Sequence, residues 1–225
     1  MSDETKSTRP LYRILSWVIT LLTPVALVLA AVRLMLTPAF LPIEYNMPGF
    51  PADPYGFTKE DRLYWSRIAS DYLLNSADIS FLGDLRFEDG TPVYNERELK
   101  HMVDVKIAIQ WTLIVWYISL GMLIALSLWA WKAGWLDDYR VGLSRGGFLT
   151  AALLVVILLF VLLSFGVLFV AFHDVFFEPG TWMFNYSDTL IRLFPERFWQ
   201  DIFIYVGSIA ISSGLAIGFG LRKKV

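Results

Sequence analysis

Four long apolar stretches recur along the chain of 225 residues. Asp, Glu, Lys and Arg are absent from residues 14–32, 107–131, 146–172 and 202–221. A helix needs about 20 mostly apolar residues to cross the hydrocarbon core of a bilayer. The pattern therefore predicts four membrane-spanning helices.

Residues 37–94, between the first two apolar stretches, show shorter patterns. Prolines punctuate residues 37–54, which predicts an irregular or extended start. Thr58 and Asp61 then have the spacing of a capping box, and apolar residues recur at helical intervals as far as Leu73. This part of the chain therefore predicts one amphipathic helix.

A turn signal follows at Asp89 and Gly90, a dipeptide suited to the positive φ angles of a type I′ hairpin. The flanking residues 85–88 and 91–94 fit two short strands, and Pro92 confines the second of them to a sheet edge. The sequence therefore predicts a hairpin after the amphipathic helix.

These elements predict an all-α polytopic membrane protein with four transmembrane helices and a small mixed α/β extracytoplasmic subdomain between helices 1 and 2. The four transmembrane helices are expected at 14–36, at 95–131 with an extended outer end, at 147–173 and at 199–221. The segments between them are the subdomain at 37–94, a cytoplasmic loop at 132–146 and an extracytoplasmic loop at 174–198. Cytoplasmic tails are expected at 1–13 and 222–225.

Charged residues indicate which side of the membrane faces the cytoplasm. Both tails and residues 132–146 carry Lys or Arg with few acids, whereas residues 37–106 and 173–197 hold most of the acidic residues. Since cytoplasmic loops are enriched in Lys and Arg, we expect both termini in the cytoplasm. This distribution predicts a multi-pass protein of the cell membrane.

Composition narrows the possible functions. Apolar residues make up 56% of the chain and charged residues only 18%, below the roughly 25% of soluble domains. The chain has no cysteine, which excludes thiolate nucleophiles, CxxC redox pairs and cysteine-ligated zinc. A net charge of −2 without a basic, aromatic-rich patch gives no support for nucleic-acid binding.

The chain has two histidines, and both stand at the end of an apolar stretch. His101 comes shortly before residues 107–131, and His173 directly follows residues 146–172. If these two helices run in opposite directions, both imidazoles lie near the outer membrane surface, where the glycerol esters of lipids reside. A shared functional site is therefore one interpretation of the pair.

Carboxylates flank both histidines. Glu98 and Asp104 lie about one helical turn either side of His101, and Asp174 follows His173. Each histidine also fits an interfacial anchor, and Glu98 also fits a capping-box acid three residues after Asn95. The structural and functional interpretations both stay open on this pattern.

A metal site is a further alternative for the histidine pair. Two histidines with Asp174 or Asp188 would give a small set of ligands. The Glu98-x-x-His101 spacing occurs in carboxylate-bridged di-iron bundles, but those sites need a second such motif, which His173 lacks.

Two small-residue motifs have simpler explanations. Gly142-Leu-Ser144-Arg-Gly146 matches the G-x-S-x-G of serine hydrolases, but it lies in the expected cytoplasmic loop, and we expect a flexible connection there. Ala210, Gly214 and Gly218 recur every four residues, which predicts a face for close helix packing.

Two blocks around the histidines carry a family resemblance. The first runs Asn95-Glu-Arg-Glu-Leu-Lys-His101-Met-Val-Asp104-Val-Lys106, and the second runs Phe172-His173-Asp-Val-Phe176-Phe177 and continues with Trp182, Asp188 and Phe194-Pro195. In these residues and their order, the chain resembles the bacterial lipoprotein intramolecular transacylase family of four-helix membrane proteins. The resemblance does not extend residue by residue to positions 37–94.

The resemblance implies an enzyme that acts on diacylglyceryl-modified lipoproteins in the membrane, with its active site at the outer leaflet and with no cofactor or metal. An acyl chain would leave the glyceryl ester of the modified cysteine and join the α-amine of that cysteine, giving the lyso form. The catalytic residues would be His101 and His173. The supporting or substrate-binding residues would be Glu98, Asp104, Asp174, Trp182, Asp188 and Arg192.

This chemistry suits the residues present. Nucleophile and electrophile belong to one substrate molecule, so the protein needs to position them and move protons rather than supply a covalent nucleophile. An α-amine with a pKa near 8 needs a base, and the leaving alkoxide needs an acid. Arg192 or backbone N–H groups are candidates for the oxyanion. The alternatives are a metal-dependent intramembrane lipid or ester hydrolase and a non-catalytic membrane partner protein.

Overall fold

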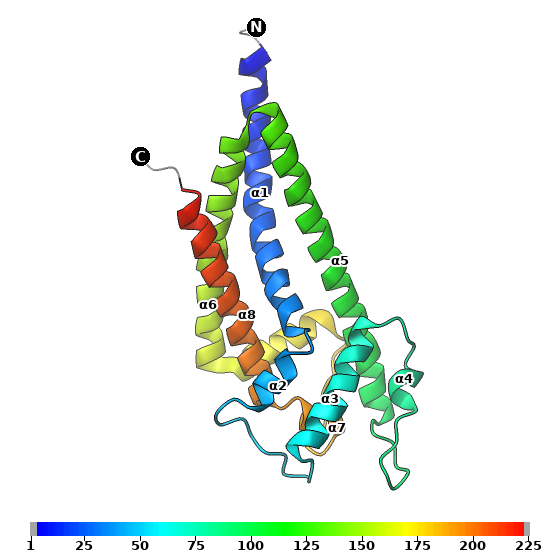
Figure 1. Ribbon diagram of the computed structural model, residues 1–225. Coiled ribbons are helices and arrows are strands. Elements are labelled where there is room, and N and C mark those ends of the chain that lie inside the picture. Colours follow the sequence, from blue (N-terminus) through cyan, green and yellow to red (C-terminus); the bar gives the residue numbers. More distant parts are fainter. Residues whose placement is uncertain (1–3, 223–225) are drawn as a thin grey trace. The chain divides into compact units, whose positions relative to one another are not determined.

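The computed structural model describes residues 4–222, and these residues form eight helices (Figure 1). In chain order they are α1 (Glu4–Met35), α2 (Phe40–Tyr45), α3 (Lys59–Leu74), α4 (Ser80–Gly83), α5 (Glu96–Ala133), α6 (Leu136–Phe176), α7 (Thr189–Leu193) and α8 (Glu196–Gly220). The ends of both predicted tails, with Lys223 and Lys224, lie outside the described residues.

Four of these helices are long and apolar enough to cross a membrane. The spans are Pro10–Met35 of α1 and the whole of α5, α6 and α8. The prediction of four membrane helices is therefore confirmed for the described part of the chain. Helix α6 is interrupted at Ser164, where φ and ψ are −159° and 65°.

The described residues form two compact units. The first unit comprises residues 4–33, 113–159 and 204–222, and the second comprises 34–112 and 160–203. Each of the four long helices contributes residues to both units. The two histidines belong to the second unit.

The first unit is a bundle held together by apolar side chains and by close backbone contacts. One cluster joins α1 to α5 and to the start of α6, and its buried members are Ile19, Ala26, Leu123, Ala130, Trp135 and Tyr139. A smaller cluster joins Ala31 of α1, Leu154 of α6 and Ala210 of α8.

Glycines let the backbones of α6 and α8 touch. A Cβ added at Gly214 would lie 2.6 Å from the carbonyl oxygen of Gly147, and one added at Gly147 would collide with the carbonyl oxygen of Gly214. A Cβ at Gly218 would press on the Phe148 ring at 3.0 Å. The predicted packing face on α8 is therefore confirmed.

The G-x-S-x-G segment is helical, so the expectation of a flexible connection there is wrong. It lies in the first turns of α6, which begins at Leu136, inside the predicted 132–146 loop. Gly142 and Gly146 pack closely on Ser16 and Thr23 of α1, and the Ser144 hydroxyl donates to the carbonyl of Gly218 at 2.8 Å. These contacts stabilise the helix in a segment that contains two glycines.

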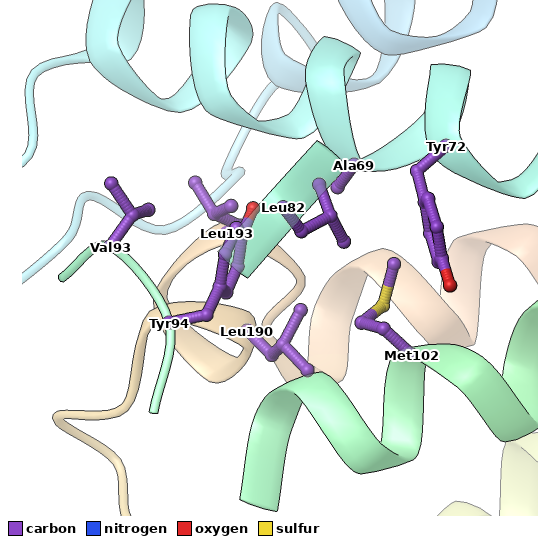
Figure 2. Close-up of a cluster of buried hydrophobic side chains, with 8 residues drawn as sticks. All are labelled: Ala69, Tyr72, Leu82, Val93, Tyr94, Met102, Leu190 and Leu193. Atoms are coloured by element: carbon purple, nitrogen blue, oxygen red, sulfur yellow. The ribbon is translucent and has the colours of Figure 1, made fainter. Parts of the chain in front are cut away.

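The second unit has a separate apolar core, drawn in Figure 2. Ala69 and Tyr72 of α3 point toward Met102 of α5, and α4, α7 and the chain before α5 fill the space between them. The other members are Leu82, Val93, Tyr94, Leu190 and Leu193. This core joins the start of α5 to α7, which follows α6 in the chain.

Helix α3 begins where the sequence predicts. The backbone N–H of Asp61 donates to the Thr58 hydroxyl at 3.1 Å, and the N–H of Thr58 donates to the Asp61 carboxylate at 2.9 Å, which completes a capping box. Buried Arg62 on this helix donates to the carbonyl of Pro51 at 2.6 Å and lies over the rings of Tyr45 and Phe50.

The predicted mixed α/β subdomain is wrong in its β part, because no strand forms among residues 4–222. Gly90 has a φ of +82°, as a turn requires, but the pairing stops at one isolated antiparallel bridge between Arg86 and Pro92. Proline has no N–H to extend a ladder, and Val93 turns its side chain into the helical core instead. The segment is a tight turn between helices.

A short helix, α2, occupies part of the region that the prolines predicted to be irregular or extended. Pro42 lies in its first turn, where a missing N–H leaves no helical hydrogen bond unmade. The Tyr45 hydroxyl donates to the carbonyl of Leu193 at 2.5 Å, and Phe40 meets Phe198 edge-on. These contacts with α7 and α8 stabilise α2.

Candidate active site

The structure brings the two histidines together within the second unit. His101 lies in the second turn of α5 and His173 in the last turn of α6, with ring centroids 6.3 Å apart and planes inclined by 23°. Each residue is 8% exposed. At this separation both imidazoles can reach one small group of substrate atoms.

A backbone carbonyl fixes the orientation of His173. The Nδ1 atom lies 2.8 Å from the carbonyl oxygen of Phe169, one turn earlier in α6. A carbonyl oxygen only accepts, so Nδ1 carries a proton and donates it. In the neutral ring the lone pair is therefore on Nε2, which is the atom available for proton transfer.

Aromatic rings surround both imidazoles. Phe177 and Phe184 meet the His101 ring edge-on, at centroid distances of 4.9 and 5.3 Å. His173 lies 4.0 Å from the Phe169 ring and 4.7 Å from the Trp182 ring. We call these four residues, with the two histidines, the aromatic site. Its walls are apolar, so charges inside it interact more strongly than in water.

Two polar atoms in the aromatic site are buried without a hydrogen-bond partner among the described residues. They are Nδ1 of His101 and the indole Nε1 of Trp182. An unmade hydrogen bond at a buried polar group costs about 1 to 3 kcal/mol. Such atoms are therefore candidates for contact with substrate.

Glu98, predicted as a neighbour of His101, is engaged elsewhere. Its carboxylate accepts from the backbone N–H of Asn95 at 2.8 Å and from the N–H of Leu190 at 2.7 Å. The Asn95 side chain accepts from the Glu98 N–H in return, at 3.0 Å. The capping-box interpretation is confirmed, and the same carboxylate joins the start of α5 to α7.

The other acids near the histidines are less deeply placed. Asp104 is half-buried on α5, and Asp174 is exposed on α6. Lys106 forms no ion pair with Asp104. Instead it donates to the side chain of Asn75 at 3.1 Å and the carbonyl of Ala77 at 2.5 Å. Neither carboxylate is shown to orient an imidazole.

Arg192 and Asp188 take part in two separate ion pairs. The Arg192 guanidinium donates to the carboxylate of Asp53 at 2.9 Å and lies over the Phe57 ring, 3.5 Å from its centroid. Asp188 precedes α7 and accepts from the N–H of Asn185 at 2.8 Å and from Arg97 at 3.4 Å. Arg192 is thus held against Asp53, and Asp188 is paired with Arg97 rather than with Arg192.

Hydrogen bonds set the charge state of Asp53. Burial alone would raise its pKa, but the bonds from Arg192 and from the Phe57 N–H outweigh burial and lower that pKa below its ordinary value. Asp53 is therefore an anion across the neutral pH range, and the ion pair is permanent there.

The histidine pair lacks the further ligands of a metal site. Within residues 4–222, no group of three or more His, Asp or Glu side chains is arranged to hold a metal ion. The two imidazoles are surrounded by aromatic rings instead.

Sequence reasoning missed two parts of the aromatic site. The Phe169 carbonyl and ring were not predicted, although a residue four positions before His173 on a helix is its neighbour. Trp182 was predicted as a supporting residue, but no local pattern indicates that its N–H would lie buried beside His173.

A family model described as lipoprotein intramolecular transacylase Lit matches residues 15–199. The chain belongs to the Lit family. The match covers α2 to α7 and both histidines, and it includes the second unit almost completely. The resemblance to this family is therefore confirmed.

Solved structures share the fold of this Lit family member. The membrane-integral lipoprotein intramolecular transacylase Lit from Bacillus cereus is 20% identical, with a TM-score of 0.60 over 92% of this chain and 94% of that chain. A form of it with a histidine-to-arginine substitution is 17% identical, with a TM-score of 0.54 over 97% and 95%. An uncharacterized protein from Aquifex aeolicus (strain VF5) is 25% identical over 214 residues, 92% of this chain and 93% of that protein.

Proposed function

We propose that this chain transfers an acyl chain within a diacylglyceryl-modified lipoprotein, from a glyceryl ester to the α-amine of the modified cysteine, with His101 and His173 as acid and base. Membership of the Lit family supports lipoprotein transacylation. The observation that carries the residue assignment is the 6.3 Å separation of two buried imidazoles in one aromatic site.

The reaction needs two proton movements and no additional reactant. The α-amine nitrogen attacks the ester carbonyl carbon, and a base removes a proton from that nitrogen. The bond from carbon to the glycerol oxygen then breaks, and an acid protonates the leaving alkoxide. The products are an amide and a free glycerol hydroxyl, so atoms and charge balance.

The geometry of His173 suits one of these steps. Its Nδ1–H is occupied by Phe169, so Nε2 takes or gives the proton. The nearby His101 ring serves the other step. Since both reacting groups belong to one substrate molecule, holding them in place supplies much of the rate acceleration.

The test is replacement of each histidine by alanine, followed by mass measurement of the N-terminal peptide of a lipoprotein. We expect wild-type protein to convert the diacylglyceryl form to the lyso form, and each variant to lose about 10²- to 10⁴-fold in rate. Conversion at the wild-type rate by both variants would refute the assignment of the histidines. Release of free fatty acid instead of an N-acyl product would indicate hydrolysis.

The orientation in the membrane belongs to the same proposal. We place the termini in the cytoplasm and the aromatic site at the outer leaflet, because both tails and residues 132–146 carry Lys or Arg with few acids. The chain has no cysteine, so labelling of a single introduced cysteine shows on which side of the membrane that residue lies. We expect Tyr186→Cys to react with a membrane-impermeant maleimide in intact cells, and Asp137→Cys to react only after permeabilisation.

A further inference from the structure

Apart from the two histidines themselves, the indole of Trp182 is the one described donor that combines two properties. Its Nε1–H is buried and has no acceptor among the described residues, and its ring lies 4.7 Å from the His173 ring. Other unpartnered buried donors, such as Nε of Arg62 and the hydroxyl of Tyr94, belong to residues that have no ring contact with either histidine.

A second tryptophan in the same unit shows the usual arrangement. The indole N–H of Trp199 donates to the carbonyl of Phe194 at 3.1 Å. Both indoles pack near the Phe169 ring, at centroid distances of 6.3 Å for Trp182 and 6.4 Å for Trp199. The two residues therefore differ in whether the protein supplies an acceptor, and in that only Trp182 has a ring contact with His173.

We propose that Trp182 is a further catalytic residue, whose N–H donates a hydrogen bond to the carbonyl oxygen of the substrate ester in the transition state. This inference rests on the transacylation proposed above. The missing acceptor of the indole then arrives with the substrate, beside the imidazole that moves the proton.

The reaction creates the charge that this donor would stabilise. As the amine nitrogen attacks, the π electrons of the carbonyl move onto its oxygen and form a tetrahedral oxyanion. When the bond to the glycerol oxygen breaks, those electrons re-form the carbonyl, now of the amide. A donor aimed at this oxygen interacts more strongly with the oxyanion than with the ester, so it raises kcat.

The surroundings of Trp182 favour this role. Phe169, Phe177 and Phe184 line the aromatic site with apolar rings, which strengthens a hydrogen bond to an anion there. Arg192, the charged alternative predicted from sequence, is held by Asp53 and by the carbonyl of Tyr55. A neutral donor avoids burying a further charge in the site.

The test is Trp182→Phe, which removes the N–H and keeps an aromatic ring. We expect kcat for N-acylation of a diacylglyceryl lipopeptide to fall by about 10²-fold, with KM changed by less than threefold. Thermal stability should stay level or rise, because the lost donor has no partner in the protein. Replacement of Trp182 by 3-benzothienylalanine, which matches the indole in shape, should give the same loss of kcat.

Trp199→Phe is the matched control. It removes an N–H that the protein itself uses, so we expect lower thermal stability and a kcat within threefold of wild type. Only a donor to the reacting atoms predicts this opposite pattern in the two variants.

The outcomes separate this inference from the proposed function. A wild-type rate in Trp182→Phe or in the benzothienyl variant, with His101→Ala inactive, would overturn the role of the N–H and leave the transacylase assignment in place. Equal losses of stability and rate in Trp182→Phe and Trp199→Phe would reduce Trp182 to a packing residue. Absence of N-acyl product with wild-type protein would overturn both proposals.

Discussion

The Nδ1 atom of His173 lies 2.8 Å from the carbonyl oxygen of Phe169. This bond belongs to the folded protein and needs no substrate. It assigns different tasks to the two ring nitrogens, because Nδ1 fixes the ring and, in the proposed mechanism, Nε2 transfers the proton. The tasks can be separated by substitution.

We predict that His173→Asn folds almost as well as the wild type and is nearly inactive. The Asn amide can donate to the Phe169 carbonyl in place of Nδ1–H, whereas Nε2 has no substitute. His173→Ala should lose the bond as well, which lowers stability by about 1 kcal/mol. Thermal unfolding and lipopeptide conversion, measured on both variants, check this. More than a tenth of wild-type activity in His173→Asn would contradict it.

Arg192 and Asp53 give a second prediction. Removing the carboxylate in Asp53→Ala leaves a largely buried guanidinium unpaired, because the Arg192 side chain is only 13% exposed. We expect a loss of about 3 kcal/mol in unfolding free energy. Activity should follow the folded fraction, because neither side chain contacts the histidines. The exposed pair of Arg140 and Asp137 is the control, and Asp137→Ala should change stability by less than about 1 kcal/mol.

The same pair predicts a pH dependence. The folded pKa of Asp53 is below its ordinary value, so the unfolded chain binds its proton first as the pH falls. The stabilising contribution of Asp53 is therefore present above about pH 4 and is lost as the pH falls through the folded pKa. Denaturant titrations from pH 3 to 7 should show this slope in the wild type and a shallower one in Asp53→Asn.

Glu44 predicts the opposite slope. Burial, aided by the nearby carboxylate of Asp201 and opposed by Arg197, raises the pKa of Glu44 from 4.5 to about 7. The folded protein thus keeps a proton that the unfolded chain has lost, and stability falls as the pH rises from about 4.5 to about 7, by up to about 3 kcal/mol. Glu44→Gln should remove this slope and be the more stable protein at pH 8. The exposed Glu60→Gln should keep it.

The helix contact at Gly214 predicts a steric effect. A Cβ there would lie 2.6 Å from the carbonyl oxygen of Gly147, so α6 and α8 must separate to admit it. We expect Gly214→Ala to lose about 1 to 3 kcal/mol of stability. Gly121→Ala on α5, where no atom lies within 4 Å of the new Cβ, should be neutral or slightly stabilising. Equal melting temperatures for the two variants would refute the packing argument.

The parts of the fold that were predictable depend on local signals. Absence of charge marked the four membrane helices, and the Thr58 and Asp61 pair marked the start of α3. The prediction of a hairpin was wrong because Asp89 and Gly90 determine only the turn, whereas strand pairing depends on the residues that pack against the two flanking segments. Here the neighbours draw Val93 into a helical core.

The candidate site divides in the same way. Both histidines could be singled out because each lies beside an apolar stretch, His101 before one and His173 after another, and opposite helix directions then place them together. The partner of Arg192 lies 139 residues earlier in the chain, and no short motif indicates that pairing. The environment of the Trp182 N–H depends on how the loop after α6 folds back, which residue spacing alone does not specify.

The carboxylate of Glu98 has a consequence for engineering this protein. It accepts hydrogen bonds from the N–H groups of Asn95 and Leu190. It therefore connects α5, which bears His101, to α7, which follows the loop that bears Trp182. Exchanging that loop with one from a relative would shift Leu190 and strain its hydrogen bond with Glu98. Chimeras intended to alter lipoprotein preference should therefore be spliced outside residues 95–190, so that Glu98 and both of its hydrogen-bond donors come from one parent.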